Sequence, residues 1–473
     1  MTSRRNLLTL ALLTTGAPAS ALAAPSEEVE VYDVVVVGGG IGGLSAALSA
    51  AESGASVVLL EKNAFLGGDT ILSGGTFNAV DPKLQKPLGI RDDYDWFARQ
   101  ILESAEGRAD PDVVKVYARE CTTSLLWLEA HGMRFLPELF EIFGSGFRRT
   151  HRPAFPRGRG YVRCLSEAAL DYGVKIRLES EARSFVRLGG RIAGVVVRER
   201  GAGKRYMARG GVVIASGGFA ANTALLKRYA PAYAGLPIDG QPSSTGEMLL
   251  RAREIGADLC NLEFVECVPG APPGIDYQVR LDYNADDMIL VNASGRRFTR
   301  ETGTRREIAE AIAAEKGPCF EISEGARVEK FNAVNQKDLW RGYFAKVAWK
   351  ADTPEDLALK LGLPPAALRE EVDLALASGK FSGPPYWGVK VHLRIHCTLG
   401  GLRIDPSARV LDERRRPIPG LWAAGSVTGN IHGVNRLGAN GINCACSFGR
   451  IAGSEATKAS RAFPGRERAK HFS

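Results

Sequence analysis

The sequence predicts an α/β fold in which a parallel sheet is interrupted by an inserted α+β domain. Two apolar runs, at residues 34–37 and 57–60, flank a glycine-rich turn and a run of small residues, which together form a strand–turn–helix–strand unit. Glycine-rich apolar sequence returns at residues 397–453, after a middle block without this pattern. A first domain split by an insertion explains this order, and 473 residues are enough for two domains.

The turn of this unit, GGGIGG, satisfies GxGxxG through Gly38, Gly40 and Gly43. Such glycines permit a tight turn, let backbone amides approach a pyrophosphate, and let the helix pack closely on the strand. Glu61 follows the second strand about twenty residues further on, where an acid accepts hydrogen bonds from a ribose. An ordinary βαβ unit is the alternative, but the complete set favours a dinucleotide-binding site of the Rossmann type.

The remainder of the first domain combines helix, loop and meander. Residues 112–130 are predicted to form a helix that ends before Gly132, and residues 143–160, rich in Arg, Gly and Pro, a surface loop. An apolar strand within residues 211–219 runs into glycines. Glycine-containing turns separate the short strands of a meander, expected at residues 175–178, 184–188, 192–198 and 206–208.

The middle block has no nucleotide motif and contains predicted helices at residues 307–315 and 357–377. We therefore interpret it as an inserted domain. The predicted division of the chain is a signal at residues 1–24, the first part of the nucleotide domain at 30–263, the inserted domain at 264–394, and the second part of the nucleotide domain at 395–473.

The first 24 residues carry an Arg pair, Arg4 and Arg5, a short apolar core and an Ala-Leu-Ala cleavage signal. This pattern is typical of a twin-arginine signal, which exports folded proteins and predicts a periplasmic location. A general secretory signal or a retained anchor is the alternative. No later apolar stretch approaches the ~20 residues that a membrane helix needs, so no integral membrane segment is expected.

The composition, with 45% hydrophobic and 24% charged residues, is that of an ordinary globular protein. A net charge of +8 without a basic run interleaved with aromatics argues against nucleic-acid binding. The eight cysteines do not have metal-ligand spacing, so no metal site is predicted, and no CxxCH motif for covalent haem occurs.

Six segments carry a family resemblance: GGGIGGLSAA, GGDTILSGGTFNA, VVIASGGF, ILVNASGRRFTRETGTRR, HCTLGG and LWAAGSVTGNIHGVNRLGANGI. On these segments the chain resembles the soluble fumarate-reductase/succinate-dehydrogenase-type flavoproteins, which include flavocytochrome fumarate reductases and urocanate reductase. The resemblance implies a Rossmann-like FAD-binding domain of the GR2 type and a capping domain that closes over the isoalloxazine.

The resemblance also implies which residues contact FAD. In membrane-bound members a His at the position of Asp69 carries the flavin covalently, so Asp69 predicts non-covalent FAD. Members usually have an acid where Ser426 stands, and a Ser hydroxyl can still accept a ribityl hydrogen bond. The expected contacts are Gly38, Gly40, Gly42, Gly43, Glu61, Lys62, Gly68, Asp69, Thr70, Gly74, Gly75, Ala182, Gly217, Glu247, Cys397, Gly425, Ser426, Asn440, Gly441 and Ile442.

The chemistry implied by the resemblance is hydride transfer from flavin N5 to an activated C=C bond, followed by protonation. Three residues match the active-site motifs: Arg305 in GTRRE, His396 in HCTLGG and Arg436 in HGVNRLG. Arg436 offers a planar fork for a carboxylate, and His396 can donate to the same group. By analogy Arg305 is the proton donor, and it needs a relay because a guanidinium rarely releases a proton.

Two departures from the family pattern predict an unusual substrate. Val268 or a neighbour stands where fumarate reductases have a second carboxylate-binding His, so an apolar wall of Val268 and neighbours such as Phe264 is expected at the far end of the pocket. Leu281 and Asn284 stand at the usual relay positions, and Asp282 is a candidate replacement for the relay acid.

The preferred interpretation is a periplasmic FAD-dependent reductase of a 2-enoate that has one carboxylate and a less polar far end, with fumarate a poor substrate. Without a haem motif or second flavin motif, electrons are expected from an external cytochrome or quinol-linked donor. One alternative is a dehydrogenase of a carboxylate or ketone, of the succinate, tricarballylate or ketosteroid type, that reduces a quinone or cytochrome. The other is a non-catalytic electron-transfer subunit, against which the three active-site matches speak.

Overall fold

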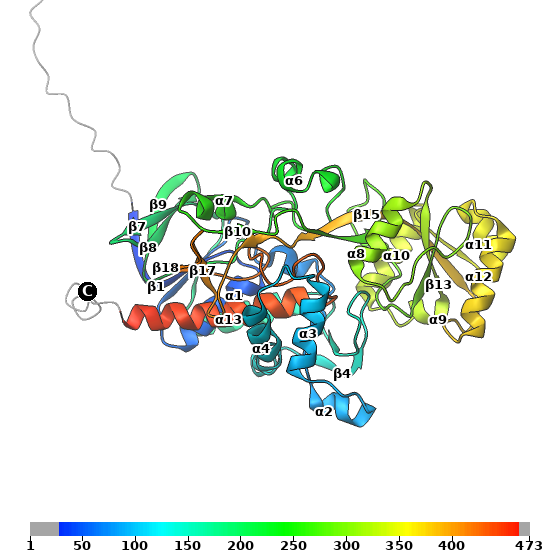
Figure 1. Ribbon diagram of the computed structural model, residues 1–473, viewed down its shortest axis with the longest axis horizontal. Helices are drawn as coiled ribbons and strands as arrows, with labels where there is room; N and C mark the ends of the chain where they lie inside the picture. Colours follow the sequence, from blue (N-terminus) through cyan, green and yellow to red (C-terminus); the bar gives the residue numbers. More distant parts are fainter. Residues whose placement is uncertain (1–27, 463–473) are drawn as a thin grey trace, which may run out of the picture.

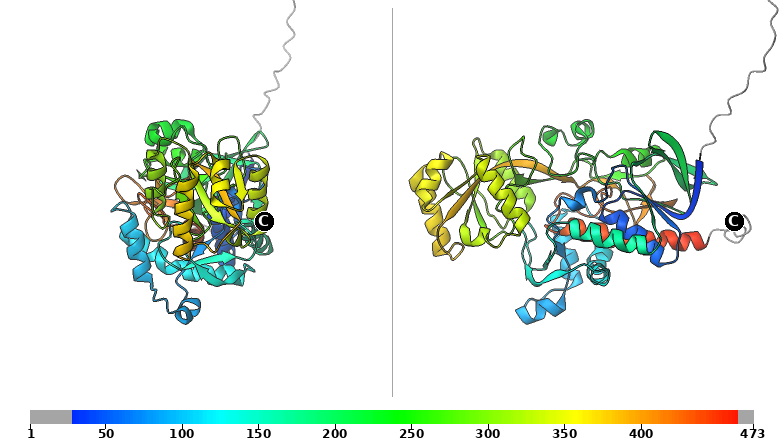
Figure 2. Two further views of the ribbon diagram at one scale, coloured as in Figure 1. Left: turned by 90° about the vertical axis from the view of Figure 1, so that its right-hand side faces the viewer. Right: turned by 180° about the vertical axis from the view of Figure 1, so that it is seen from behind.

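The computed structural model describes residues 28–462, and the predicted export signal at residues 1–24 lies outside them. The molecule is elongated, with a large α/β body at one end and a smaller sheet domain at the other (Figure 1). Seen from behind, the smaller domain projects from the body and the two ends of the described chain lie at the opposite end (Figure 2). The predicted α/β fold class is confirmed.

The body is built on an eight-stranded sheet with the order β17–β18–β9–β1–β2–β6, to which β7 and β8 are added through β9. The strand β1 pairs in parallel with both β2 and β9, and the last five residues of β1 are buried. The strands are β1 Glu28–Val37, β2 Val57–Leu60, β6 Lys175–Arg177, β7 Ser180–Leu188, β8 Arg191–Glu199, β9 Ala202–Ile214, β17 Arg409–Leu411 and β18 Pro417–Ala423.

Two helices from opposite ends of the sequence, α1 (Ile41–Glu52) and α13 (Asn440–Arg461), lie side by side against this sheet (Figures 1 and 2). Their contact depends on glycine, because a Cβ on Gly453 would lie 2.1 Å from the Ala46 carbonyl oxygen. The other helices of the body are η1 Gly68–Ile71, α2 Pro82–Gln85, η2 Lys86–Leu88, α3 Tyr94–Ser104, α4 Pro111–Ala130, α5 Arg159–Asp171, α6 Thr223–Tyr229, η3 Pro231–Tyr233 and α7 Glu247–Glu254.

The predicted meander is wrong in two respects. Its first strand, β6, does not join β7 and β8 but extends the parallel sheet beside β2. Its last strand and the separate apolar strand expected at 211–219 are one continuous strand, β9, whose first half pairs with β8 and whose second half pairs with β18. Gly210 and Gly211 lie inside β9, where a Cβ on either would clash with backbone, so these glycines mark close packing rather than a turn.

Residues 143–160 do not form the predicted surface loop. They include β5 (Thr150–Pro153), which pairs with β3 (Phe77–Asn78) and β4 (Phe135–Phe140). Arg149 is only 1% exposed because its guanidinium binds Asp92 at 2.7 Å and stacks on Phe97. A charged residue can be buried when it is paired in this way, and composition alone does not reveal the pairing.

The inserted domain is a five-stranded sheet with the order β11–β15–β13–β12, with β14 also paired to β15. The predicted boundary at 394/395 falls inside β15, which runs from this sheet into the body.

The helix expected at residues 357–377 is two helices, because Gly362 has a left-handed φ of +72° and Pro364 precedes the second one. The elements are β11 Val265–Gly270, β12 Met288–Val291, α8 Arg305–Ala314, β13 Cys319–Glu324, α9 Gly325–Val328, α10 Ala333–Phe344, β14 Ala348–Ala351, α11 Pro354–Leu361, α12 Pro365–Ala377 and β15 Tyr386–Thr398, and a short pair, β10 Leu259–Cys260 and β16 Gly401–Leu402, lies in the body.

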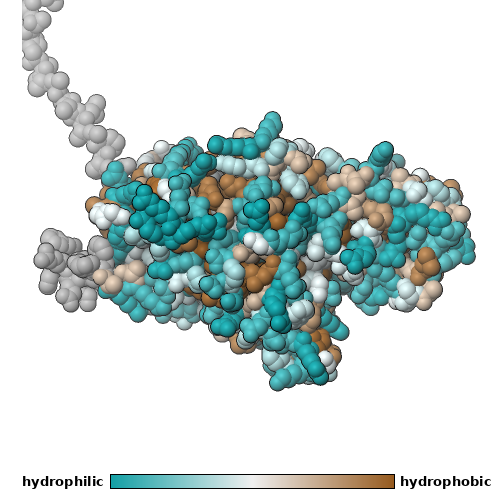
Figure 3. Space-filling model, in the orientation of Figure 1, coloured by the Kyte–Doolittle hydropathy of each residue, from teal (hydrophilic) through white to brown (hydrophobic). Residues whose placement is uncertain are grey.

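The face seen in Figure 3 is largely hydrophilic, with apolar side chains in small separate areas. Within residues 28–462, no helix combines the length and the apolar character needed to cross a membrane.

Candidate functional site

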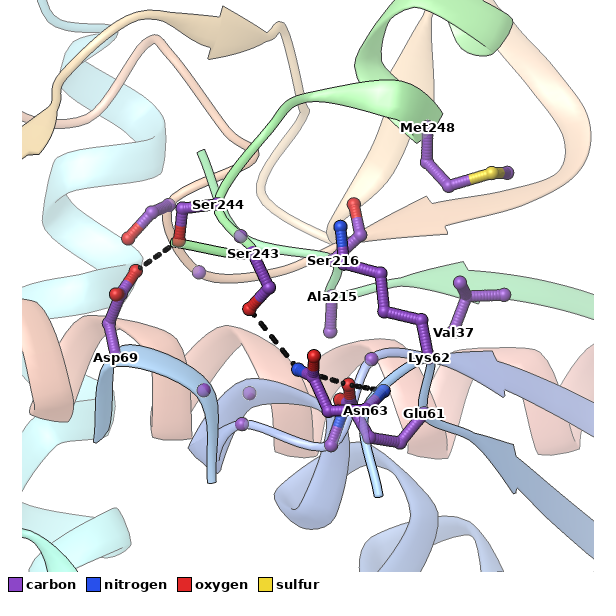
Figure 4. Close-up of a pocket in the computed structure, with 18 of the residues that line it drawn as sticks. Val37, Glu61, Lys62, Asn63, Asp69, Ala215, Ser216, Ser243, Ser244 and Met248 are labelled. Carbon is purple, nitrogen blue, oxygen red and sulfur yellow. Dashed lines mark hydrogen bonds between the residues drawn. The ribbon is translucent and has the colours of Figure 1, made fainter. Parts of the chain in front are cut away.

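A cavity lies where β1 and β2 end and α1 begins, next to the GGGIGG turn (Figure 4). Gly38 has φ +110°, and a Cβ on it would lie 2.3 Å from the Ala215 carbonyl oxygen. A Cβ on Gly43 would lie 1.8 Å from the Gly38 carbonyl oxygen, so the third glycine allows helix and turn to touch. These glycines leave the backbone amides and the N-terminus of α1 open to the cavity, as a pyrophosphate requires.

Glu61 is buried at the edge of this cavity and holds the turn in place. One carboxylate oxygen accepts a hydrogen bond of 2.7 Å from the Gly39 amide, and the other accepts two from Asn63 at 2.8 Å. Lys62 reaches across to Glu247 on α7, with 2.9 Å between Nζ and the carboxylate. Glu61, Lys62 and Glu247 thus all line this cavity.

Asp69 faces the same cavity from η1 (Figure 4). Its carboxylate accepts hydrogen bonds from the Gln241 amide at 2.7 Å and the Ser244 hydroxyl at 2.8 Å. The sequence interpretation missed this partner segment, because Ser243 and Ser244 lie in a loop without a recognised motif. Asn63, which donates to Ser243 at 3.1 Å, was missed as well.

A second cavity continues the first toward the inserted domain, and both are lined by Ile41, Asp69, Thr70, Gly425, Ser426 and Ala445. An elongated dinucleotide therefore has one continuous path. Of the residues expected to contact FAD, the first cavity is lined by Gly38, Gly40, Gly42, Glu61, Lys62, Gly68, Asp69, Thr70, Ala182, Gly217, Glu247, Gly425 and Ser426. The second is lined by Gly74, Gly75, Cys397, Gly441 and Ile442 in addition to the shared ones.

Gly43 and Asn440 line neither cavity. Gly43 serves the packing of α1 on the turn, and Asn440 is fully buried, where its side-chain oxygen accepts a hydrogen bond of 2.8 Å from Asn78. Asn440 therefore fixes the start of α13 against β3. The sequence motif alone could not show whether Asn440 has this structural role or contacts the cofactor.

The three residues predicted to be catalytic all line the second cavity. Arg305 is the first residue of α8, behind a capping box formed by Thr304 and Glu307. His396 lies near the end of β15, and Arg436 lies in the segment before α13. Both arginines are almost fully buried, at 7% and 6% exposure, although one belongs to the inserted domain and the other to the body.

A buried carboxylate that sequence analysis missed, Glu266 on β11, joins the three residues. One of its oxygens is bonded to Arg436, lies 3.2 Å from Arg305 Nη1 and lies 4.0 Å from His396 Nε2. Burial raises the pKa of Glu266, but the positive charges of Arg436 and Arg305 outweigh it and lower this pKa to about 2. The sequence signal is a single acid in the otherwise apolar strand VECVPG.

The histidines of the second cavity differ in their surroundings. His396 Nδ1 lies 3.4 Å from the carboxylate of Asp239, whose pKa is lowered mainly by His396 against the opposing effect of burial. Burial and the nearby charge of Arg436 lower the pKa of His432 to about 3, so His432 is neutral. Of the two histidines, His396 is therefore the one that has a carboxylate partner and also lies near Glu266, which binds Arg305 and Arg436.

A second arginine–carboxylate pair lines the cavity near Arg305. Arg280 binds Asp282 through two nitrogens, one of them at 2.6 Å, and the Asp282 side chain has no exposed surface. Glu321 on β13 lies behind them, and burial followed by the charge of Asp282 raises its pKa well above the usual range. Leu281 points into the core of the inserted domain instead.

The apolar wall expected from Val268 and Phe264 is wrong. Val268 is 1% exposed, but neither it nor Phe264 lines the second cavity, and Phe264 lies under the guanidinium of Arg108. A strand alternates its side chains between faces, and the irregular pairing after Glu266 shifts that alternation, so the sequence alone could not say which side chain enters the cavity. Among residues 28–462, no group of three or more His, Cys, Asp and Glu side chains could hold a metal ion.

The sheet, the glycine turn and the two joined cavities define a flavin-dependent oxidoreductase. The family model for the FAD binding domain matches residues 33–442, and the chain belongs to this family. It is 33% identical over 458 residues to the probable fumarate reductase Ifc3 of Shewanella frigidimarina (strain NCIMB 400), covering 92% of this chain and 76% of that protein.

Two further comparisons agree. The chain is 30% identical over 466 residues to a urocanate reductase of Eggerthella lenta, covering 92% of this chain and 76% of that protein. The solved open conformation of a flavocytochrome c3 fumarate reductase has a TM-score of 0.74 and 32% identity, covering 93% of this chain and 79% of that one. The predicted family resemblance is confirmed, and the chain is an FAD-dependent oxidoreductase of the type that acts on CH–CH groups.

Proposed function

We propose that this protein reduces the C=C bond of a 2-enoate that has one carboxylate. The observation that carries the proposal is the convergence of Arg305, Arg436 and His396 on a cavity continuous with the FAD cavity. Similarity to fumarate and urocanate reductases supports the class of substrate. A non-catalytic electron-transfer subunit would have no use for two buried arginines at this place.

Bound FAD supplies the hydride that reaches one alkene carbon. The protein's part begins with Arg436, whose Nε is buried and has no partner among the described residues, and which holds the substrate carboxylate. His396 donates to the same group. Together they polarise the alkene and stabilise the negative charge that develops next to the carboxylate.

Arg305 then protonates the neighbouring carbon. Burial, assisted by the charges of Arg436 and Arg280, lowers the pKa of Arg305, which favours proton release from a group that otherwise keeps its proton. The Arg280–Asp282 pair lines the same cavity and is the candidate relay that returns the proton to Arg305. Arg280 and Asp282 thus provide the acid and the base of a relay, although Leu281 and Asn284 occupy the positions where relatives have their relay residues.

FAD is held without a covalent bond in this proposal. Asp69 stands at the position of the flavin-linked His, and its carboxylate is engaged by Gln241 and Ser244. We expect acid precipitation of the yellow protein to leave the flavin in the supernatant, measured by its absorbance and fluorescence. Flavin that stays with the washed pellet would contradict the assignment.

The proposal includes export of the folded, flavin-loaded protein to the periplasm, based on Arg4 and Arg5 in the segment outside the described residues. Replacing both with Lys is expected to retain the precursor in the cytoplasm. The measurement is flavin content and enzyme activity in periplasmic and cytoplasmic fractions. Unchanged periplasmic activity would favour the general secretory route instead.

The experiment that tests the proposed function is steady-state turnover with reduced viologen as donor and a panel of unsaturated acids as acceptors. An external cytochrome or quinol-linked donor is part of the proposal, so viologen should support turnover and NADH alone should not. The second candidate, a dehydrogenase of a saturated carboxylate or ketone, is tested in the same assay run in reverse with an artificial electron acceptor. Oxidation without any measurable enoate reduction would favour that candidate.

A further inference from the structure

The clamp of Arg436, Arg305 and His396 already holds a carboxylate of the protein itself. Glu266 is 4% exposed, and the oxygen that faces the two arginines is shared between them. The other oxygen is buried and has no hydrogen-bond partner among the described residues. Glu266 does not line the second cavity; it lies behind the arginines, against a third cavity on the side of α8.

Two other positively charged or chargeable groups that line the second cavity, Arg280 and His396, each have a carboxylate partner of their own. Arg280 is bound through two nitrogens to Asp282, and His396 faces Asp239. Asp69 is bound by Gln241 and Ser244 on the side of the first cavity. The positive charge available to a substrate therefore comes from Arg436 and Arg305, and Glu266 cancels one of their two charges.

A single remaining positive charge suits one substrate carboxylate. A dicarboxylate would bring two negative charges next to the buried charge of Glu266, and its second carboxylate would find the guanidinium of Arg280 already taken by Asp282. Like charges brought together in a buried site cost binding free energy, and they discriminate against the wrong ligand.

We propose that Glu266 is the specificity-determining residue that restricts the substrate to a monocarboxylate. Its own carboxylate is bound by Arg436 and Arg305, so these arginines can neutralise only one carboxylate of the substrate. It is a positioning residue that works through Arg436 and Arg305 and does not touch the substrate. This inference rests on the proposed reduction of an enoate. It replaces the apolar wall of Val268 and Phe264 as the reason for rejecting fumarate.

The variant Glu266→Gln tests this role, because an amide keeps a similar shape and can still accept a hydrogen bond from Arg436 while it removes the charge. We expect the ratio of kcat/KM for fumarate to kcat/KM for cinnamate to rise by about 10-fold or more. A residue that only supports the fold would lower both values and leave their ratio unchanged, and that result would overturn the proposal.

The matched control is Glu301→Gln. Glu301 is another buried acid of the inserted domain, bound to Arg297 and to the Leu290 amide, and it lines neither of the two joined cavities. We expect it to leave the ratio as in the wild type, whatever it does to stability. Glu266→Asp, which keeps the charge, is expected to lower both activities and retain the preference for the monocarboxylate.

A binding measurement separates this inference from the proposed function. Saturated analogues, succinate and 3-phenylpropanoate, are titrated into the flavin-loaded wild type and their dissociation constants are read from the flavin absorbance, which needs no turnover. We expect 3-phenylpropanoate to bind more tightly, and the difference to shrink in Glu266→Gln. Tighter binding of succinate by the wild type would overturn the role of Glu266, even if the variant fails to fold. Absence of enoate turnover together with the expected binding order would instead refute the proposed reaction alone.

Discussion

Replacing Arg305 with Ala is expected to lower enoate reduction by about 10²–10⁴-fold, the usual contribution of a general acid. The proposed proton leaves from this guanidinium, whose pKa is lowered by burial and by two neighbouring arginines. Reduction of the flavin by viologen should be unaffected, because in the proposal Arg305 acts on the substrate and is not among the residues expected to contact FAD. The measurement is the rate of flavin reduction and the steady-state kcat, determined on the same preparation.

The next residue along α8 provides the control for this prediction. Arg306 is of the same type, but its side chain is 40% exposed and pairs with Glu310 and Glu106 at the surface. Arg306→Ala should therefore keep close to wild-type turnover. An Arg305→Ala enzyme that retains most of its kcat would show that another group delivers the proton, and Asp282 would be the next residue to examine.

The second large effect concerns stability. Replacing Arg436 with Met leaves the carboxylate of Glu266 buried, with Arg305 at 3.2 Å as its remaining ionic partner apart from His396. Breaking a buried pair by removing one member commonly costs about 3–5 kcal/mol. We expect a loss in the free energy of unfolding at the lower end of that range, since Arg305 remains, together with a large rise in KM for the enoate.

The double variant Arg436→Met with Glu266→Gln separates the two consequences. Removing the unpaired charge should restore most of the stability, measured by denaturant unfolding, but not the binding of substrate. The low pKa of Glu266, about 2, also makes the stability depend on pH. A carboxylate whose pKa is lowered on folding stabilises the folded state above its unfolded pKa of about 4.3, and this stability is lost as the pH falls toward 2. A double variant as unstable as the single one would contradict this account of the pair.

The nucleotide half of the site could be predicted because it depends on backbone chemistry. A pyrophosphate needs glycines at fixed spacing and an acid at the end of the next strand, so Gly38, Gly43 and Glu61 can be recognised from their spacing alone. The insertion of a second domain could also be predicted, because the glycine-rich pattern typical of nucleotide binding stops before the middle block and returns at residues 397–453. The family segments then located Arg305, His396 and Arg436.

What could not be predicted is which side chains face one another across the two domains. Glu266 is one acid among several in the sequence, and only the pairing of β11 with β15 places it between Arg305 and Arg436. The same strand irregularity keeps Val268 away from the substrate cavity. Arg149 is a similar case. Its charge predicts a surface position, but it is buried because it is paired with Asp92, 57 positions away in the sequence.

Reoxidation of the reduced flavin by unsaturated acids is the decisive measurement for the proposed reduction of a monocarboxylic enoate. The purified protein is reduced without oxygen by dithionite and mixed rapidly with cinnamate, fumarate or an unsaturated 3-ketosteroid, and the return of the flavin absorbance is followed. We expect fast reoxidation by cinnamate, slower reoxidation by fumarate, and the saturated acid as product. Reoxidation by the ketosteroid with no response to any unsaturated acid would contradict the proposal.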